Sequence, residues 1–236
     1  MAPPLSSNSP TSRSLRRQRK LRKWHRWLAL VTAVQLLLWT LSGAYFAFVD
    51  INFVRGADHR VAPVPVAVDL AAVNWATDEG TELLVRHRLP GELVVGVVGA
   101  EATVWYTAAG AALAELDAQE ALQLAASATD LNPDSAILVD EDVVGSEYRG
   151  RPLPLWRVFN SEQPSTVAYL DATSGEVVAI RNTAWRWWDF LWSLHIMDYD
   201  DRDTIGTVLL KLFSVLAVLT AIMGIALFIS LPNKWR

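Results

Sequence analysis

Two long apolar segments constrain this chain more than any other feature of its sequence. The segments from Trp27 to Val49 and from Thr207 to Leu231 each supply the roughly 20 apolar residues that a helix needs to cross the hydrocarbon core of a bilayer. Tryptophans stand near the ends of both segments, as they do in the aromatic belts of membrane proteins. The sequence therefore predicts two transmembrane helices that flank a central region.

The distribution of charge predicts the orientation of these helices. Eight basic residues precede the first segment, between residues 13 and 26, and Lys234 and Arg236 follow the second. The region 51–206 contains ten arginines, no lysine and 24 acidic residues, so its formal charge is −14. Basic residues close to a span are retained on the cytoplasmic side of the membrane. We therefore expect both termini in the cytoplasm and the region 51–206 in the extracytoplasmic space.

A removable signal peptide is the alternative explanation of the first apolar segment, because such peptides also follow a basic flank. The apolar run is longer than the core of a typical signal peptide, and no A-x-A cleavage site follows it. A retained anchor is therefore favoured. The chain has no cysteine, which excludes disulfides, thiolate metal sites and cysteine nucleophiles and suits an extracytoplasmic protein.

The central region contains an internal repeat. The segments from Thr103 to Leu116 and from Thr166 to Ile180 both begin with T-V-x-Y and continue through a glycine-bearing turn into a second apolar strand. Two further strands with alternating apolar residues precede each of them, as in a sheet with one covered face. A short helical segment precedes each set of strands, at 69–76 and at 117–128, and Asp117 with Glu120 in the second segment fits a capping box. The sequence predicts two units, each with one helix on an antiparallel sheet.

These patterns divide the chain into eight parts. In chain order we expect a disordered basic cytoplasmic tail (1–23), a first transmembrane helix (24–50), a linker (51–65), the first repeat (66–116), the second repeat (117–183), an interfacial tryptophan-rich helix with an acidic turn (184–203), a second transmembrane helix (204–231) and a cytoplasmic tail (232–236).

The stretch WRWWDFLWSLHIM, residues 185–197, places four tryptophans and a histidine beside an acidic run. Trp188, Trp192 and His195 follow one another at i, i+4 and i+7, so they share one face of a helix. We expect this face to lie flat in the outer membrane interface, with the tryptophans in the headgroup layer and the following acids in water.

The acidic run permits two interpretations. Oxygen ligands suit hard cations such as calcium or ferric iron, which makes a metal site of Asp198, Asp200 and Asp201 one of them. The favoured interpretation is that Asp203 or Thr204 caps the second span, whose dipole stabilises negative charge near its N-terminus.

Two polar residues inside the spans also need partners. Gln35 lies in the middle of the first span, and we expect it to bond with Thr220 or with another chain. Lys211 lies about two turns inside the second span, from where its long side chain can extend back toward the acidic run.

Several of these segments resemble those of a known protein family. The segment LDATSGEVVAI at 170–180, after the strand LPLWRVF at 153–159, resembles the PepSY module, a small extracytoplasmic α+β domain. The apolar segments resemble the transmembrane helices associated with that module, and the resemblance extends from Arg22 to Leu231. It implies a membrane α+β fold in which two transmembrane helices flank an extracytoplasmic domain of two PepSY-like repeats.

The resemblance also suggests a cofactor. Larger relatives with four spans act as inner-membrane reductases for ferric siderophores or flavins and carry b-type haem on histidines of their helices. By resemblance, His25 and His195 occupy those positions, with Trp188 and Trp192 beside His195. Since 27–49 is a helix of roughly 34 Å, one iron cannot join His25 to His195, and a second ligand would come from a homo-oligomer or a partner membrane redox subunit. A pair of His59 and His195 is the alternative within one chain, and simple anchoring in the interface is the alternative for His25.

Catalytic and nucleotide-binding signatures are absent from the sequence. It contains no G-x-S-x-G, H-E-x-x-H, Walker loop or dinucleotide-binding glycines, and no threonine motif for covalent FMN. The basic run before residue 27 is explained by topology and anionic lipid, so no nucleic acid is expected as a partner. We expect no catalytic activity from this chain alone.

Two functions remain. The first is an inner-membrane PepSY-type subunit of an electron-transfer or iron/flavin reduction system that binds haem with a partner chain. The second is a cofactor-free, membrane-anchored accessory module that binds a protein or peptide, in a peptidase-regulating or complex-assembly role.

Overall fold

The structure, a computed structural model, describes residues 12–63, 67–73, 75, 80–100 and 103–230. The chain divides into two compact units. The helical unit comprises Met1–Ala47 with Leu191–Arg236, and the head comprises Phe48–Phe190.

The helical unit contains two helices that are long and apolar enough to cross a membrane. These spans, Arg19–Phe48 and Val208–Ile229, lie in α1 (Ser12–Phe48) and α5 (Val208–Ser230). The expected disordered tail was wrong from residue 12 onward, since α1 already begins there. Arginine, lysine, glutamine and leucine dominate the first turns of α1, and all four have high helix propensity. Residues 1–11 lie outside the described part of the chain.

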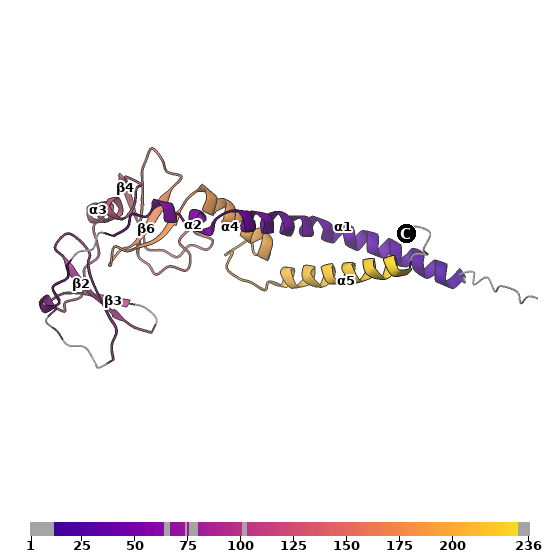
Figure 1. The fold of residues 1–236 in the computed structure, drawn as a ribbon, viewed down its shortest axis with the longest axis horizontal. Helices are drawn as coiled ribbons and strands as arrows, with labels where there is room; N and C mark the ends of the chain where they lie inside the picture. The colour runs from indigo at the N-terminus through magenta and orange to yellow at the C-terminus, as the bar shows by residue number, and fades with distance from the viewer. Residues whose placement is uncertain (1–11, 64–66, 74, 76–79, 101–102, 231–236) are drawn as a thin grey trace, which may run out of the picture. The chain divides into compact units, whose positions relative to one another are not determined.

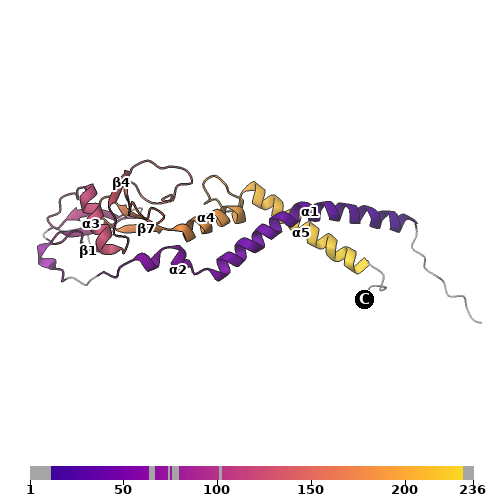
Figure 2. The ribbon, with the colours of Figure 1, turned by 90° about the horizontal axis from the view of Figure 1, so that it is seen from above.

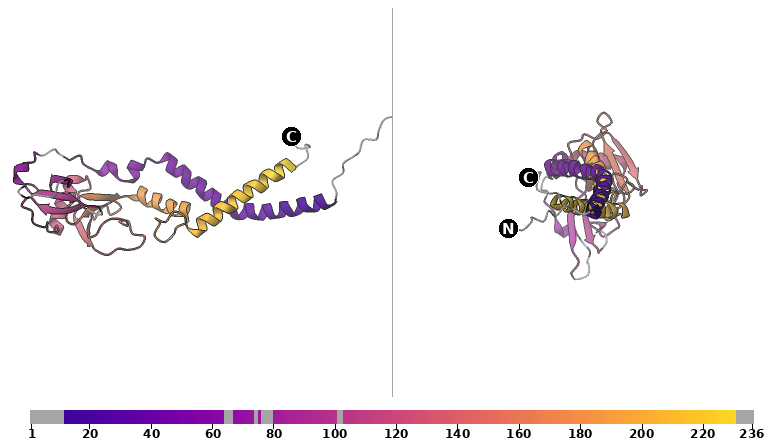
Figure 3. Two further views of the ribbon diagram at one scale, coloured as in Figure 1. Left: turned by 90° about the horizontal axis from the view of Figure 1, so that it is seen from below. Right: turned by 90° about the vertical axis from the view of Figure 1, so that its right-hand side faces the viewer.

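The two long helices lie side by side and run antiparallel (Figures 1 and 2). They come close enough for a Cβ placed on Gly224 in α5 to lie 3.3 Å from His25 Cε1 in α1. Their crossing is also visible in the left view of Figure 3. A glycine at this position lets the imidazole pack directly against the backbone of α5.

The head contains two antiparallel sheets. The first has the strand order β1-β2-β3, and the second has the order β4-β5-β6-β7. Their strands are β1 (Leu83–His87), β2 (Leu93–Val98), β3 (Thr103–Thr107), β4 (Ser135–Val139), β5 (Leu155–Phe159), β6 (Val167–Asp171) and β7 (Val177–Arg181).

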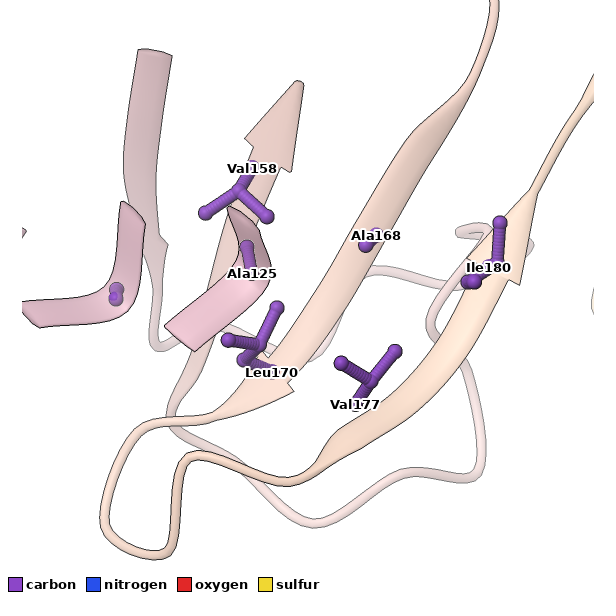
Figure 4. Close-up of a cluster of buried hydrophobic side chains, with 7 residues drawn as sticks. Ala125, Val158, Ala168, Leu170, Val177 and Ile180 are labelled. Atoms are coloured by element: carbon purple, nitrogen blue, oxygen red, sulfur yellow. The ribbon is translucent and has the colours of Figure 1, made fainter. Parts of the chain in front are cut away.

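Helix α3 (Ala118–Ala128) covers one face of the four-stranded sheet. Figure 4 shows Ala125 of α3 above Val158, Leu170 and Val177, which belong to one buried cluster. The predicted capping box is confirmed, since the Asp117 side chain accepts from the backbone of Glu120 and the Glu120 side chain accepts from the backbone of Asp117.

The opposite face of the same sheet is also covered. Along β6, Val167 and Tyr169 belong to a second buried cluster, whereas Ala168 and Leu170 belong to the cluster under α3. This alternation is the period of two that a strand requires, and here both faces are buried. The segment around Tyr148 and Leu153 packs against the second cluster.

The first predicted repeat is only partly formed. Its three strands have the same antiparallel order as β4, β5 and β6. The helix predicted at 69–76 was wrong in its described part, because only a 3-10 turn, η2 (Leu70–Ala72), forms and the chain is extended again at Val73. Asn74 and residues 76–79 lie outside the described residues. The counterpart of β7 is reduced to one isolated bridge between Tyr106 and Ala112.

Three shorter helical segments connect these parts. The predicted linker contains α2 (Ile51–Val54) and the 3-10 turn η1 (Ala57–His59), and Val54 is buried. The tryptophan-rich stretch forms α4 (Thr183–Ile196), a continuous helix whose first residues belong to the head and whose last residues belong to the helical unit.

Candidate functional site

The end of α4 lies against the middle of α1. The last carbonyl groups of a helix have no partner inside the helix, and in a membrane they need one from elsewhere. Two side chains of α1 supply it: Gln35 Nε2 donates to the Leu194 carbonyl at 3.1 Å, and Trp39 Nε1 donates to the His195 carbonyl at 2.7 Å. The expectation that Gln35 bonds with Thr220 was therefore wrong, and the buried Thr220 hydroxyl has no hydrogen-bond partner in the described residues.

The imidazole of His195 is held by a hydroxyl of α1. His195 Nδ1 lies 2.7 Å from Ser42 Oγ, and Ser42 is fully buried. Ser42 Oγ donates its own hydrogen to the backbone, with the Leu38 carbonyl at 2.8 Å. Because a hydroxyl has one hydrogen and that of Ser42 is directed to the backbone, we assign Ser42 Oγ as the acceptor of Nδ1–H of His195. The neutral ring then has its hydrogen on Nδ1 and an open lone pair on Nε2, which is the tautomer that binds metals through Nε2.

Aromatic rings surround this imidazole. Trp192 stacks parallel to it, with ring centroids 6.4 Å apart and an interplanar angle of 5°. Phe46 of α1 meets it edge-on, with centroids 5.7 Å apart, and Trp39 lies at 6.4 Å. The face with Trp192 and His195 was expected to lie flat in the membrane interface, but at these two residues it packs against α1 instead. Trp188, the third residue of that face, is half-buried and belongs to the head.

His25 has different surroundings at the other end of the helix pair. Its Nδ1 is buried and has no hydrogen-bond partner in the described part of the chain. The adjacent Cε1–Nε2 edge of the ring faces α5, with Cε1 at 3.3 Å and Nε2 at 3.8 Å from a Cβ placed on Gly224. The structure therefore places the two histidines apart. Of these two, only His195 has its Nδ1 in a hydrogen bond, which leaves Nε2 as the nitrogen that can bind a metal.

The acidic loop after α4 is bonded to its own backbone. Asp198 is buried, and its Oδ2 accepts from the Thr204 N–H at 2.9 Å. A hydrogen bond with the Asp198 side chain is the main cause that lowers the pKa of Asp201, and Asp200 is exposed. No group of three His, Asp or Glu side chains within the described ranges is arranged to hold a metal ion. The cation site at Asp198, Asp200 and Asp201 stays a prediction without geometric support.

The cap of the second span is Thr207, so the prediction of Asp203 or Thr204 was wrong. Thr207 Oγ1 accepts from the Leu210 N–H at 3.1 Å, and α5 begins at the next residue, Val208. The reason is the preceding glycine: Gly206 has φ +106° and turns the chain just before the helix starts. The Lys211 side chain folds back toward this turn, with Nζ 4.0 Å from a Cβ placed on Gly206, and its approach to the acidic run stays a prediction.

The first half of α4 carries ion pairs that the sequence interpretation missed. Asp189 is 2% exposed and pairs with Arg149, while Arg186 forms two hydrogen bonds with Glu147 at 2.6 and 3.1 Å. The signal was available as charged residues three apart on a helix of aromatic residues. These pairs fix α4 to the head at the loop that follows β4.

An arginine of β7 completes this cluster. The Arg181 guanidinium lies 4.3 Å from the centre of the Trp185 ring and donates to the Glu147 carbonyl at 2.8 Å. Burial, together with the nearby positive charge of Arg151, lowers its pKa to about 10. The cation–π contact and the carbonyl stabilise the charge that remains.

The other histidines lie in the head. His59 Nδ1 lies 2.9 Å from Asp130 Oδ1, which explains His59 as part of the contact between η1 and the end of α3. His87 Nε2 on β1 is buried without a hydrogen-bond partner in the described residues. The pairing of His59 with His195 stays a prediction.

Comparison with known proteins gives one match. A family model described as the PepSY-associated TM region matches residues 23–236, which is nearly the whole chain. No curated protein matches the chain significantly. No solved structure matches it significantly either.

Proposed function

Because the chain belongs to the family of the PepSY-associated TM region, we propose that it is a membrane subunit of an electron-transfer or iron/flavin reduction system and that His195 would hold a b-type haem. The haem, when bound, would supply reversible one-electron transfer.

The tautomer of His195 carries this proposal. Histidines that bind metals almost always donate their second ring N–H to a fixed acceptor, which orients the ring and raises its basicity. In this chain the acceptor is Ser42 Oγ, at 2.7 Å from Nδ1. Trp39 holds the backbone of the same residue through the His195 carbonyl, so ring and main chain are both fixed. The residues present thus fit a haem ligand at His195.

A second ligand would come from another chain. His25 and Ser42 are 17 residues apart on one helix, which corresponds to about 26 Å at a rise of 1.5 Å per residue. One iron cannot reach both ends of that distance. A second copy of this chain or a partner membrane subunit would therefore provide the other axial ligand or the electron acceptor.

The proposal includes an orientation in the inner membrane, with both termini in the cytoplasm and the head outside. The antiparallel helix pair and the excess of basic residues before α1 support this orientation. Alkaline phosphatase fused within the head, for example after Gly145 in an exposed loop, should be active, and the same enzyme fused after Arg236 should be inactive. The reverse pattern would contradict the orientation.

Absorption spectroscopy tests the haem. The full chain, purified in mild detergent from cells supplied with haem precursor, should show a Soret band that His195→Ala abolishes. His25→Ala and His87→Ala are the matched controls and should retain it. Ser42→Ala should retain haem about tenfold more weakly, because it removes the acceptor of Nδ1–H.

Two results would contradict this proposal. One is a wild-type protein without a Soret band, both alone and in native membranes. The other is a band that persists in His195→Ala. Either result would favour the alternative of a cofactor-free accessory module, for which crosslinking in membranes should recover a protein partner bound to the head.

A further inference from the structure

The head contains a cleft that the proposed haem site does not use. Its first part has a volume of about 500 Å³ and its second part about 490 Å³, and the two parts share walls formed by the linker before β1, the end of β1 and helix α3. The shared walls include Val61, Pro63, His87 and Leu124. Volumes of this size lie in the range of small-ligand sites, roughly 300–1,000 Å³.

The two parts of the cleft differ in chemistry. The first is lined by the cations Arg60, Arg86 and Arg88 and by one carboxylate, Glu176. The Arg88 guanidinium is already neutralised by Glu92, at 2.6 Å. The second part is lined mainly by apolar groups, among them Leu89, Pro90 and Leu124. One end of the cleft therefore favours an anion and the other end favours an apolar group.

Two of the cations of the first part, Arg60 and Arg86, form no ion pair with a carboxylate of the described residues. Arg60 is exposed and donates to the Val177 carbonyl at 2.9 Å, and Arg86 donates to the Ser174 carbonyl at 2.8 Å. Two nitrogens in the cleft wall, Arg86 Nε and His87 Nε2, are buried without a partner in the described residues. A buried polar nitrogen without a hydrogen-bond partner is unfavourable, so such groups favour a bound partner.

Burial further disfavours the unpaired charge of one of these cations, Arg86. Desolvation lowers the pKa of Arg86, and the nearby carboxylate of Glu176 opposes that change. The guanidinium also lies 4.6 Å from the centre of the Trp105 ring, which fixes its plane. A half-buried guanidinium beside an aromatic ring suits a planar carboxylate.

The cleft also follows an open sheet edge. β1 is the outer strand of its sheet, since the order is β1-β2-β3. Between β1 and β2, the Arg88 N–H donates to the Glu92 carbonyl and the Val98 N–H donates to the Glu82 carbonyl. Along an antiparallel strand, every second residue directs its main-chain groups to the neighbouring strand. By that alternation, the main-chain groups of Val85 and His87 point away from β2. No described strand pairs with this edge, so these groups can pair with an added extended chain.

We propose that this cleft binds the C-terminal end of an extended peptide. The peptide backbone adds to β1 at Val85 and His87, its terminal carboxylate pairs with Arg60 and Arg86, and an apolar side chain enters the part around Leu124. This inference does not depend on haem at His195.

Fluorescence anisotropy tests the proposal with the full chain in detergent. The probe is a pool of short fluorescein-labelled peptides with free C-terminal carboxylates, and the matched pool carries C-terminal carboxamides. We expect the carboxylate pool to bind and the carboxamide pool to bind about tenfold more weakly, since a charge-assisted pair is lost. Amide hydrogen exchange at Val85 and His87 should slow when the carboxylate pool is added.

Three variants sharpen the experiment. Arg60→Gln and Ser127→Glu change exposed residues of the cleft wall and should each weaken binding about tenfold, the second by repulsion. Arg55→Gln removes an exposed arginine of the same linker outside the cleft and should bind like wild type. The proposal would be overturned if the two pools bind equally, if neither binds, or if Arg55→Gln weakens binding as much as Arg60→Gln does. It would also be overturned if laurate, a fatty-acid carboxylate, displaces the peptides completely and the peptides do not slow amide exchange in β1.

Discussion

The two sheets of the head differ in how much of their surface is covered. In the four-stranded sheet, the residues from Val167 to Leu170 are all buried. Buried residues also occur on β5 and β7. In the three-stranded sheet, the buried residues lie only in the middle of β2, from Val94 to Gly96, while Leu83 and Leu84 on β1 are 37% and 43% exposed. Both sheets have the same antiparallel order, so strand order alone does not set the size of the core. The difference comes from α3, an amphipathic helix with a complete cap, whose counterpart η2 has three residues.

The largest effect should follow from truncating a leucine in the covered sheet. Leu170→Ala removes a fully buried side chain under α3 and should lower the free energy of unfolding by about 2–5 kcal/mol. Leu84→Ala on β1 is the matched control and should cost less than about 1 kcal/mol, because this leucine is half-exposed. Denaturant unfolding of the full chain in detergent, followed by tryptophan fluorescence, measures both. Equal losses would show that the first sheet has a core of comparable weight.

The next effect concerns the arginine that joins the two sheets. Arg88 pairs with Glu92 and donates to the carbonyls of Ala114 and Thr173, so it ties the β1–β2 turn to the β6–β7 turn. Arg88→Met should destabilise the first sheet locally by about 2 kcal/mol, since partly exposed Glu92 can regain water while the carbonyls lose their donor.

Hydrogen exchange resolves this local change. Amides of β1, β2 and β3 should exchange at least about tenfold faster in Arg88→Met, while those of β5 and β6 should not change. Arg157→Met is the matched control, because Arg157 lies on the second sheet, where it contacts Phe159 and Tyr169 and makes no contact with the first sheet in the described residues. Uniform acceleration across both sheets would mean that they unfold as one unit.

A smaller effect separates the two caps. Asp117→Ala removes the capping box of α3 and should cost about 1 kcal/mol. Asp69 caps η2 in the same way, with Oδ1 at 3.0 Å from the Ala71 N–H. Asp69→Ala should change the free energy of unfolding by less than about 0.5 kcal/mol, because so short a turn carries little packing. Thermal unfolding measures the loss of stability in both variants. A loss in Asp69→Ala as large as that in Asp117→Ala would contradict this expectation.

The smallest effect is a dependence on pH at the start of β4. Asp134 accepts from the Ser161 N–H at 2.8 Å and from the hydroxyls of Ser161 and Ser135, and these bonds lower its pKa from 3.8. A carboxyl with a lowered folded-state pKa contributes stability that is complete above its unfolded pKa and is lost as the pH falls through the folded value. Wild-type stability should therefore fall more steeply below pH 3.8 than that of Asp134→Asn. Parallel curves of melting temperature against pH would contradict this role.

Much of the fold follows from local sequence patterns. Length and apolarity indicate both spans, alternation indicates the strands, and Asp117 with Glu120 indicates the start of α3, because each of these signals lies within a few residues. The extent of the first repeat could not be predicted in this way. Whether the segment after Asp69 becomes a helix depends on a sheet face that the segment must cover, which is a property of the tertiary structure.

The candidate site was only half predictable. The spacing of Trp192 and His195 places them on one face of α4, as the sequence indicates. Their partners Ser42 and Trp39 lie more than 150 residues earlier in the chain, and no local pattern links them. The same reason explains Gln35, whose partner is a main-chain carbonyl and leaves no trace in residue type.

The packing of His25 over Gly224 sets how tightly the two long helices can close. A methyl group at position 224 would stand 3.3 Å from the imidazole, which is tighter than ordinary van der Waals contact, so the ring would have to shift before the helices could keep their distance. Nδ1 of the same ring is buried and has no hydrogen-bond partner among the described residues, so no hydrogen bond from Nδ1 holds the ring in place. Gly224 thus sets the distance between the two helices. Any larger residue at this position would either separate the helices or move the His25 ring.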